Sequence, residues 1–150
     1  MQRLWILLVA FVAVGMSAAV ATAQNPHFSQ SNPPTCQTTS GGRTCTVCCE
    51  GTIVGVGTEP AIVELDIEGG CRTSGNENEP PGHLQATSGP ITPSGGNIDF
   101  GTDQPLCVSV RCPRGLNTFL GNTATITLQR EGEQDETLDE TILVPNCSLE

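Results

Sequence analysis

The sequence predicts an all-β fold, an antiparallel β-sandwich of about seven strands that is braced by disulfide bonds. Three observations predict it. Apolar and polar residues alternate along several short segments, Gly, Pro and Asn residues mark turns between these segments, and eight cysteines follow an apolar N-terminal leader. No segment has the clear period of an amphipathic helix.

Residues 1–23 have the features of a signal peptide. A basic residue precedes the apolar run 4–14, and small residues follow it, with Ala21-Thr22-Ala23 as the cleavage signal. The alternative is an uncleaved membrane anchor, but a glycine and a serine interrupt the apolar stretch, which is barely long enough for a bilayer of about 30 Å. We therefore expect a secreted protein, extracellular or periplasmic, with no membrane span in the mature chain.

The clearest strand is expected at residues 61–68, where apolar residues alternate with mostly charged ones. One face of this strand should be buried and the other solvated. Residues 71–93 are rich in Gly and Pro, so a large loop with one edge strand near 83–87 is expected there. The other expected strands are 44–47, 51–56, 97–101, 106–112, 123–130 and one within 136–144.

The domain organisation follows from composition. Residues 24–42 are rich in Pro, Ser, Asn and Thr, which is typical of a flexible segment. A single β-sandwich domain is expected over residues 43–150, a length that suits one hydrophobic core. Because the aromatic residues after the leader are only Phe28, Phe100 and Phe119, that core must consist mainly of Val, Ile and Leu.

All eight cysteines follow the leader. They are Cys36, Cys45, Cys48, Cys49, Cys71, Cys107, Cys112 and Cys147. An even number in an exported chain is typical of disulfides, here up to four, each of which stabilises a fold by roughly 2–4 kcal/mol. Their number alone does not determine how they pair. The alternative, a zinc site at Cys45-Thr-Val-Cys48, lacks a second pair of ligands.

The charge of the chain disfavours two classes of partner. The formal net charge is −10, and all six cationic residues are arginines, one of them in the leader. Binding to nucleic acid or to anionic lipid requires clustered Lys and Arg. We therefore expect neither partner. Without lysine, the chain also cannot form Lys-Asn isopeptide crosslinks.

Several motifs carry a resemblance to a known group of proteins. They are Gly55-Val56-Gly57, the alternating strand after it, Cys71 with Gly75-Asn76 and Pro81-Gly82, and Cys112-Pro113 before a Thr-rich strand. Over residues 52–144 the chain resembles small secreted bacterial proteins with an Ig-like β-sandwich, a family of uncharacterised function. The loop after Cys71 is one residue longer here, and the remaining cysteines of the domain are additions to the pattern.

The resemblance implies an Ig-like fold and offers no activity, but it bears on one disulfide. Cys71 and Cys112 both lie in the similar stretch, and both stand at strand ends near the loop-rich end of the expected sandwich. We therefore expect these two cysteines to pair. The pairing of the other six stays open.

No catalytic residues are expected. The chain after the leader has two histidines, His27 in the flexible segment and His83 in the large loop, and it lacks a G-x-S-x-G nucleophile motif. Glu64, Asp66 and Glu68 project from one face of the 61–68 strand, spaced as the carboxylates of inverting glycosidases are. However, no Trp or Tyr follows the leader to form a sugar platform, so a solvated sheet face is the better interpretation.

Calcium is the only cofactor for which the sequence offers candidates. Two acidic stretches supply the hard oxygen ligands that Ca²⁺ uses. They are Asn76, Glu77, Asn78 and Glu79 in the large loop, and Glu131, Glu133, Asp135 and Glu136 before the last strand. Neither has the spacing of a calcium-binding loop, so solvated loops are the default interpretation and no metal is assigned.

Together these features favour a secreted, non-catalytic structural or interaction module that contacts a protein or cell-surface partner as a monomer or a weakly self-associating species. Two alternatives remain. A disulfide-rich enzyme inhibitor could insert the 71–93 loop into a protease cleft, and a small hydrolase could use the carboxylates or His83.

Cleavage after Ala23 should yield a mature chain that begins Gln24-Asn25. Intact mass spectrometry of the secreted protein tests this directly. Detection of a secreted species that still carries residues 1–23 would contradict the assignment of the leader.

Overall fold

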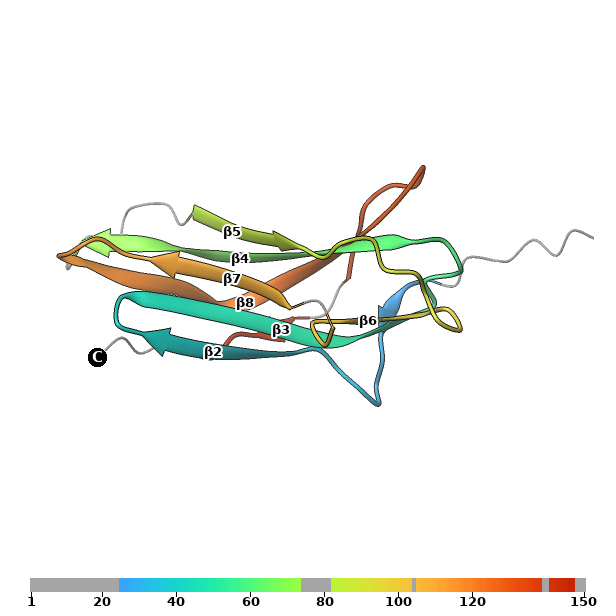
Figure 1. The fold of residues 1–150 in the computed structure, drawn as a ribbon, viewed down its shortest axis with the longest axis horizontal. Coiled ribbons are helices and arrows are strands. Elements are labelled where there is room, and N and C mark those ends of the chain that lie inside the picture. Colours follow the sequence, from blue (N-terminus) through green and yellow to red (C-terminus); the bar gives the residue numbers. More distant parts are fainter. Residues whose placement is uncertain (1–24, 74–81, 104, 139–140, 148–150) are drawn as a thin grey trace, which may run out of the picture.

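The computed structural model describes residues 25–73, 82–103, 105–138 and 141–147, and within them the chain is all β. Figure 1 shows an elongated sandwich whose long strands run along its length. The strands are His27–Phe28 (β1), Thr35–Gly41 (β2), Thr44–Val54 (β3), Ala61–Thr73 (β4), Gly82–Thr87 (β5), Asn97–Phe100 (β6), Leu106–Arg111 (β7), Leu116–Arg130 (β8), Glu136–Thr137 (β9) and Ile142–Leu143 (β10). They form two antiparallel sheets, so the predicted disulfide-braced β-sandwich is confirmed.

β3 is the central strand of the first sheet. Its first half lies between β2 and β7, and its second half lies between β1 and β6. The two strands expected at 44–47 and 51–56 are therefore one strand. The reason is that buried and more exposed side chains keep alternating through Cys48, Cys49 and Glu50, so the paired cysteines do not interrupt it.

The second sheet has the order β5-β4-β8-β10, and β9 also pairs with β8. β4 and β8 pair along almost their whole lengths, with one shift of register between Ile67 and Gly69. β5 pairs only with β4, as expected of an edge strand. The last strand expected within 136–144 is divided into the two short strands β9 and β10, which pair with different parts of β8.

The core lies between the two sheets and follows the predicted alternation. Val63, Leu65 and Ile67 of β4 are fully buried. Phe28 and Phe100 are the two aromatic side chains of this core, and their ring centroids are 6.5 Å apart. Buried partners from the other strands include Val47, Ile53, Ile98, Leu106, Val108, Ala124, Ile126 and Leu128.

All eight cysteines are in disulfides. The pairs are Cys36–Cys49, Cys45–Cys147, Cys48–Cys107 and Cys71–Cys112. The pairing expected for Cys71 and Cys112 is thus present. Four disulfides are typical of proteins outside the reducing cytoplasm. In the described part of the chain, no helix is long and apolar enough to cross a membrane.

The expectation that residues 24–42 form a flexible segment is wrong for most of their length. β1 and β2 both lie within it, and Phe28 is only 5% exposed. Composition suggested flexibility, but two long-range contacts order the segment. Phe28 packs in the core, and Cys36 is linked to Cys49 on the neighbouring strand. The β-sandwich therefore begins before residue 43.

Gly101 should be the glycine least tolerant of substitution. Its φ is +83°, and a Cβ there would collide with the carbonyl oxygen of Cys49 and lie 2.6 Å from the Cα of Glu50. Gly132 has a similar φ of +78° but open space around it. We expect Gly132→Ala to lower the free energy of unfolding by about 1 kcal/mol and Gly101→Ala by about 3 kcal/mol or more. Chemical denaturation of both variants measures this, and equal losses would contradict the close packing at Gly101.

Candidate functional site

A row of carboxylates follows the outward face of β4. Glu64, Asp66 and Glu68 alternate with the buried core residues of the same strand, so all three side chains leave the sheet on the solvent side. The solvated face expected for the strand at residues 61–68 is therefore present on β4. The facing positions on β5 and β8 carry Thr, Gln and His residues, which makes this face polar across three strands.

Asp66 is the centre of a hydrogen-bonded group on this face. The register places Gln85 directly opposite Asp66, and His83 opposite Glu68. His83 Nδ1 lies 2.8 Å from Asp66 Oδ1, and Gln85 Nε2 donates to Asp66 Oδ2 at 2.7 Å. Both carboxylate oxygens of Asp66 thus have a partner. This pairing could not be predicted from the sequence, because it depends on the register between β4 and β5.

The pKa of His83 is raised above its ordinary value of 6.5. The largest cause is the hydrogen bond to Asp66, followed by the negative charge of Asp66, with a smaller contribution from Glu68. Both carboxylates favour the protonated imidazole. The side chain of His83 is 62% exposed, and it lies on the edge strand β5.

An imidazole oriented by a carboxylate is also the arrangement of a catalytic base. In hydrolases, a hydroxyl or thiol nucleophile contacts the second ring nitrogen. In the described part of this chain, Asp66 is the only group that bonds the His83 ring. The described residues therefore bring together a base and its orienting carboxylate without a nucleophile.

Glu64 belongs to a separate contact of the same face. Its Oε2 accepts a hydrogen bond from Gln129 Nε2 on β8 at 2.7 Å. Amide groups and one histidine are therefore the partners of Glu64 and Asp66, and no arginine pairs with the row among the described residues. Among the described residues, His83 is thus the one titratable side chain that could pair with the row as a cation.

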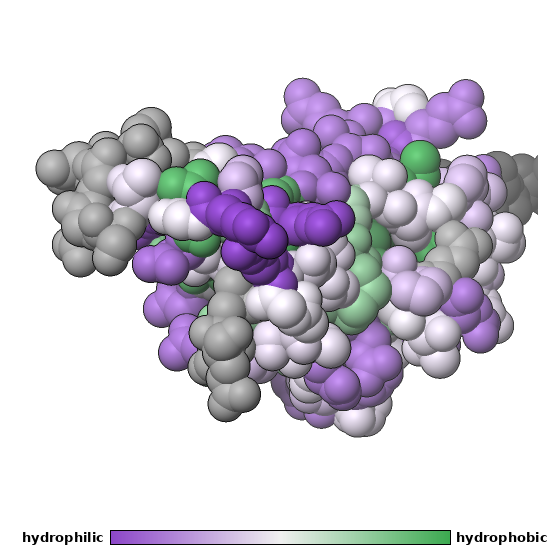
Figure 2. All heavy atoms as spheres, turned by 60° about the vertical axis from the view of Figure 1, so that its left-hand side comes forward, coloured by the Kyte–Doolittle hydropathy of each residue, from purple (hydrophilic) through white to green (hydrophobic). Residues whose placement is uncertain are grey.

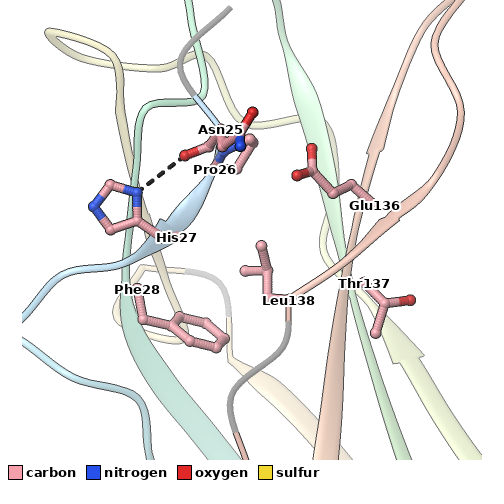
Figure 3. A pocket seen from close by; sticks show the side chains of 7 residues that line it. All are labelled: Asn25, Pro26, His27, Phe28, Glu136, Thr137 and Leu138. Atoms are coloured by element: carbon pink, nitrogen blue, oxygen red, sulfur yellow. Dashed lines mark hydrogen bonds between the residues drawn. The ribbon is translucent and has the colours of Figure 1, made fainter.

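A shallow hollow lies beside the N-terminal strand β1 and has a volume of about 340 Å³. Figure 3 shows His27 and Glu136 on opposite walls, with Phe28 and Leu138 between them. The ring of His27 is held by the backbone, because His27 Nδ1 lies 3.0 Å from Asn25 O.

The calcium candidates divide into two groups. Asn76, Glu77, Asn78 and Glu79 lie outside the described residues. In the second group, Glu133 and Glu136 both contact Arg130, at 2.7 and 3.1 Å from its Nη2. These two carboxylates thus have a cationic partner within the protein. The described residues contain no group of three or more His, Cys, Asp or Glu side chains arranged for a metal.

Sequence reasoning missed a third feature, a hollow of about 260 Å³ lined by Arg43, Arg111, Cys112 and Pro113. The two arginines are far apart in the sequence and meet because β3 and β7 pair with Thr44 opposite Arg111. The net charge gave no indication of a basic site. The signal that could have identified it is the position of both arginines within two residues of a turn residue, Gly42 for Arg43 and Pro113 for Arg111.

Comparisons with protein-family models, with curated proteins and with solved structures give no significant match. The resemblance to secreted Ig-like proteins therefore stays a prediction. Function must be argued from the surfaces described above.

Replacing Asp66 with Asn should lower the pKa of His83, because Asn keeps the size of the side chain but removes its charge. Following the imidazole proton signals against pH by NMR measures the change. Glu64→Gln is the matched control, since Glu64 makes no contact with His83, and it should leave the midpoint unchanged. An unaltered His83 midpoint in Asp66→Asn would contradict the pairing.

The same pair should make stability depend on pH. The pKa of His83 is higher in the folded than in the unfolded chain, so the contribution of the pair is fully present below about pH 6.5 and is lost as the pH rises through the folded-state pKa. The difference in denaturation midpoint between the parent protein and Asp66→Asn should therefore become smaller as the pH rises from about 6.5 through the folded-state pKa of His83. A difference that grows with pH would have the wrong sign.

Proposed function

We propose that this chain is a secreted, non-catalytic interaction module that binds a partner through its rigid surface. One observation carries the proposal. The crosslinked sandwich sorts its charges onto separate surfaces, with a carboxylate row on the outer face of β4 and exposed arginines at one end. Fixed and segregated charges are suited to recognition by electrostatic complementarity.

Rigidity supports the same function. Two of the disulfides connect neighbouring strands within the first sheet. The other two connect β3 to Cys147 and β4 to Cys112, which both lie outside the strands. A surface held in this way loses little conformational entropy when it binds. The expected signal peptide and the four disulfides support a location outside the cytoplasm.

The inhibitor alternative receives less support from the fold. It uses residues 71–93 as a large, rigid loop with one edge strand near 83–87. In the structure, Cys71–Thr73 complete β4, and Gly82–Thr87 form β5 against it. Residues 71–73 and 82–87 are therefore part of the second sheet, where 82–87 pair with β4 and 71–73 pair with β8.

The hydrolase alternative has one observation in its favour, the Asp66–His83 pair. A panel of esterase, glycosidase and protease substrates tests it, and the purified, oxidised protein should give no turnover. Turnover that persists through purification and disappears in His83→Ala, Asp66→Asn or Glu64→Gln would overturn the proposed function. A parallel panel of protease inhibition assays tests the inhibitor alternative and should also be negative.

A further inference from the structure

Most of the arginines gather at one end of the sandwich. It is the left-hand end of Figure 1, where the β2–β3 hairpin, the end of β4 and the β7–β8 turn lie together. The residues there are Arg43 in the β2–β3 turn, Arg72 in β4, Arg111 at the end of β7 and Arg114 in the β7–β8 turn. In Figure 2 this end comes forward, and strongly hydrophilic side chains gather across it. Positive charge is thus concentrated locally in a chain whose formal net charge is −10.

Arg43 and Arg111 line the same hollow because the β3–β7 pairing continues past the strand ends. Thr44 is opposite Arg111, and the next pair of residues is joined by a hydrogen bond from Cys112 N to Arg43 O at 3.2 Å. The hollow between them has a volume of about 260 Å³. That volume is large enough for a small ion or for one substituent of a larger ligand.

The side chains with N–H donors among the residues that line this hollow belong to Arg43 and Arg111. The backbone N–H of Cys112 is already used in the hydrogen bond to Arg43 O, and Pro113 has no N–H. Each guanidinium has five N–H donors and no acceptor. The polar groups offered to a ligand therefore suit a group that only accepts hydrogen bonds.

The arginines of the hollow also lack partners within the described part of the protein. Arg130, near the other end, contacts Glu133 and Glu136, and the Cζ of Arg72 lies 3.5 Å from the ring centroid of Phe119. Arg43 and Arg111 take part in no ion pair or side-chain hydrogen bond among the described residues. Their donors are thus available to a ligand.

Disulfides fix both walls of the hollow. Cys112, which lines it, is bonded to Cys71 of β4, and Cys45, two residues after Arg43, is bonded to Cys147. The backbone that carries the two arginines is therefore held in place before any ligand arrives. Such preorganisation lowers the entropic cost of binding.

From these observations we propose that the hollow between Arg43 and Arg111 binds a tetrahedral oxyanion, a sulfate or phosphate group carried by the partner. Arginine forks match the oxygens of such groups and form charge-assisted hydrogen bonds with them. The inference rests on the proposed function, because it assigns the surface through which the module recognises its partner. Arg114, in the adjacent turn, adds positive charge at the rim.

An NMR titration of the secreted, fully oxidised protein tests the site. Sodium sulfate and sodium phosphate are added in separate arms, with sodium chloride holding the ionic strength constant. We expect saturable shifts of the Nε–Hε signals of Arg43 and Arg111 and of the backbone amide of Cys112. The arm with the lower dissociation constant identifies which of the two groups the site prefers. Sodium acetate should bind at least tenfold more weakly, and equal binding would refute a site for tetrahedral groups.

Variants make the assignment specific. Arg43→Gln and Arg111→Gln should each weaken binding of the preferred anion at least tenfold, while retaining a polar side chain on an exposed position. Arg130→Gln is the matched control, because Arg130 is already paired with carboxylates, and it should leave the dissociation constant unchanged. An equal loss in all three variants would show that only net charge matters and would overturn the site.

The two proposals fail in different ways. Shifts that do not saturate, or that are the same in chloride alone, would remove the oxyanion site and leave the non-catalytic module intact. Enzymatic turnover in the substrate panel would remove the module, whatever the outcome of the titration.

Discussion

The fold depends on the crosslinking of β3 from both of its faces. Successive residues of a strand point to opposite faces of a sheet, so Cys48 and Cys49 leave β3 in opposite directions. Cys49 is buried and is linked to Cys36 of β2, whereas Cys48 is linked to Cys107 of β7. The adjacent cysteines thereby attach the central strand to both of its neighbours. Between the two sheets, the core is built mainly of Val, Ile and Leu, with Phe28 and Phe100 as its two aromatic side chains.

The alternation of apolar and polar residues along a single strand could be predicted from the sequence. Contacts between distant segments could not. The alternation at 61–68 predicted which residues of β4 are buried, because a strand buried on one face has only one arrangement of its side chains. The ordering of residues 24–42 depends on Phe28 and on the disulfide between Cys36 and Cys49. Local composition carries no information about such partners, so Pro and Ser residues suggested flexibility where strands form.

The same distinction applies to the candidate sites. The sequence placed Glu64, Asp66 and Glu68 on one solvated face, since this follows from the period of a single strand. It could not show that His83 faces Asp66, which requires the register of β5 on β4. The gathering of arginines at one end of the sandwich could not be predicted either. It requires that two separate turns and the end of β4 come to the same end of the fold.

Net charge and local charge therefore restrict the partners of this protein at different distances. A net charge of −10 governs the long-range encounter and opposes the approach of any long polyanion. At physiological ionic strength the Debye length is about 8 Å, so exposed charges farther apart than this are largely screened. An anionic group in contact with Arg43 and Arg111 is consequently attracted by these arginines at short range. A nucleic acid would have to bring many further phosphates close to the acidic surface of the protein. A partner with one or a few oxyanion groups therefore fits the charge distribution better than a continuous polyanion.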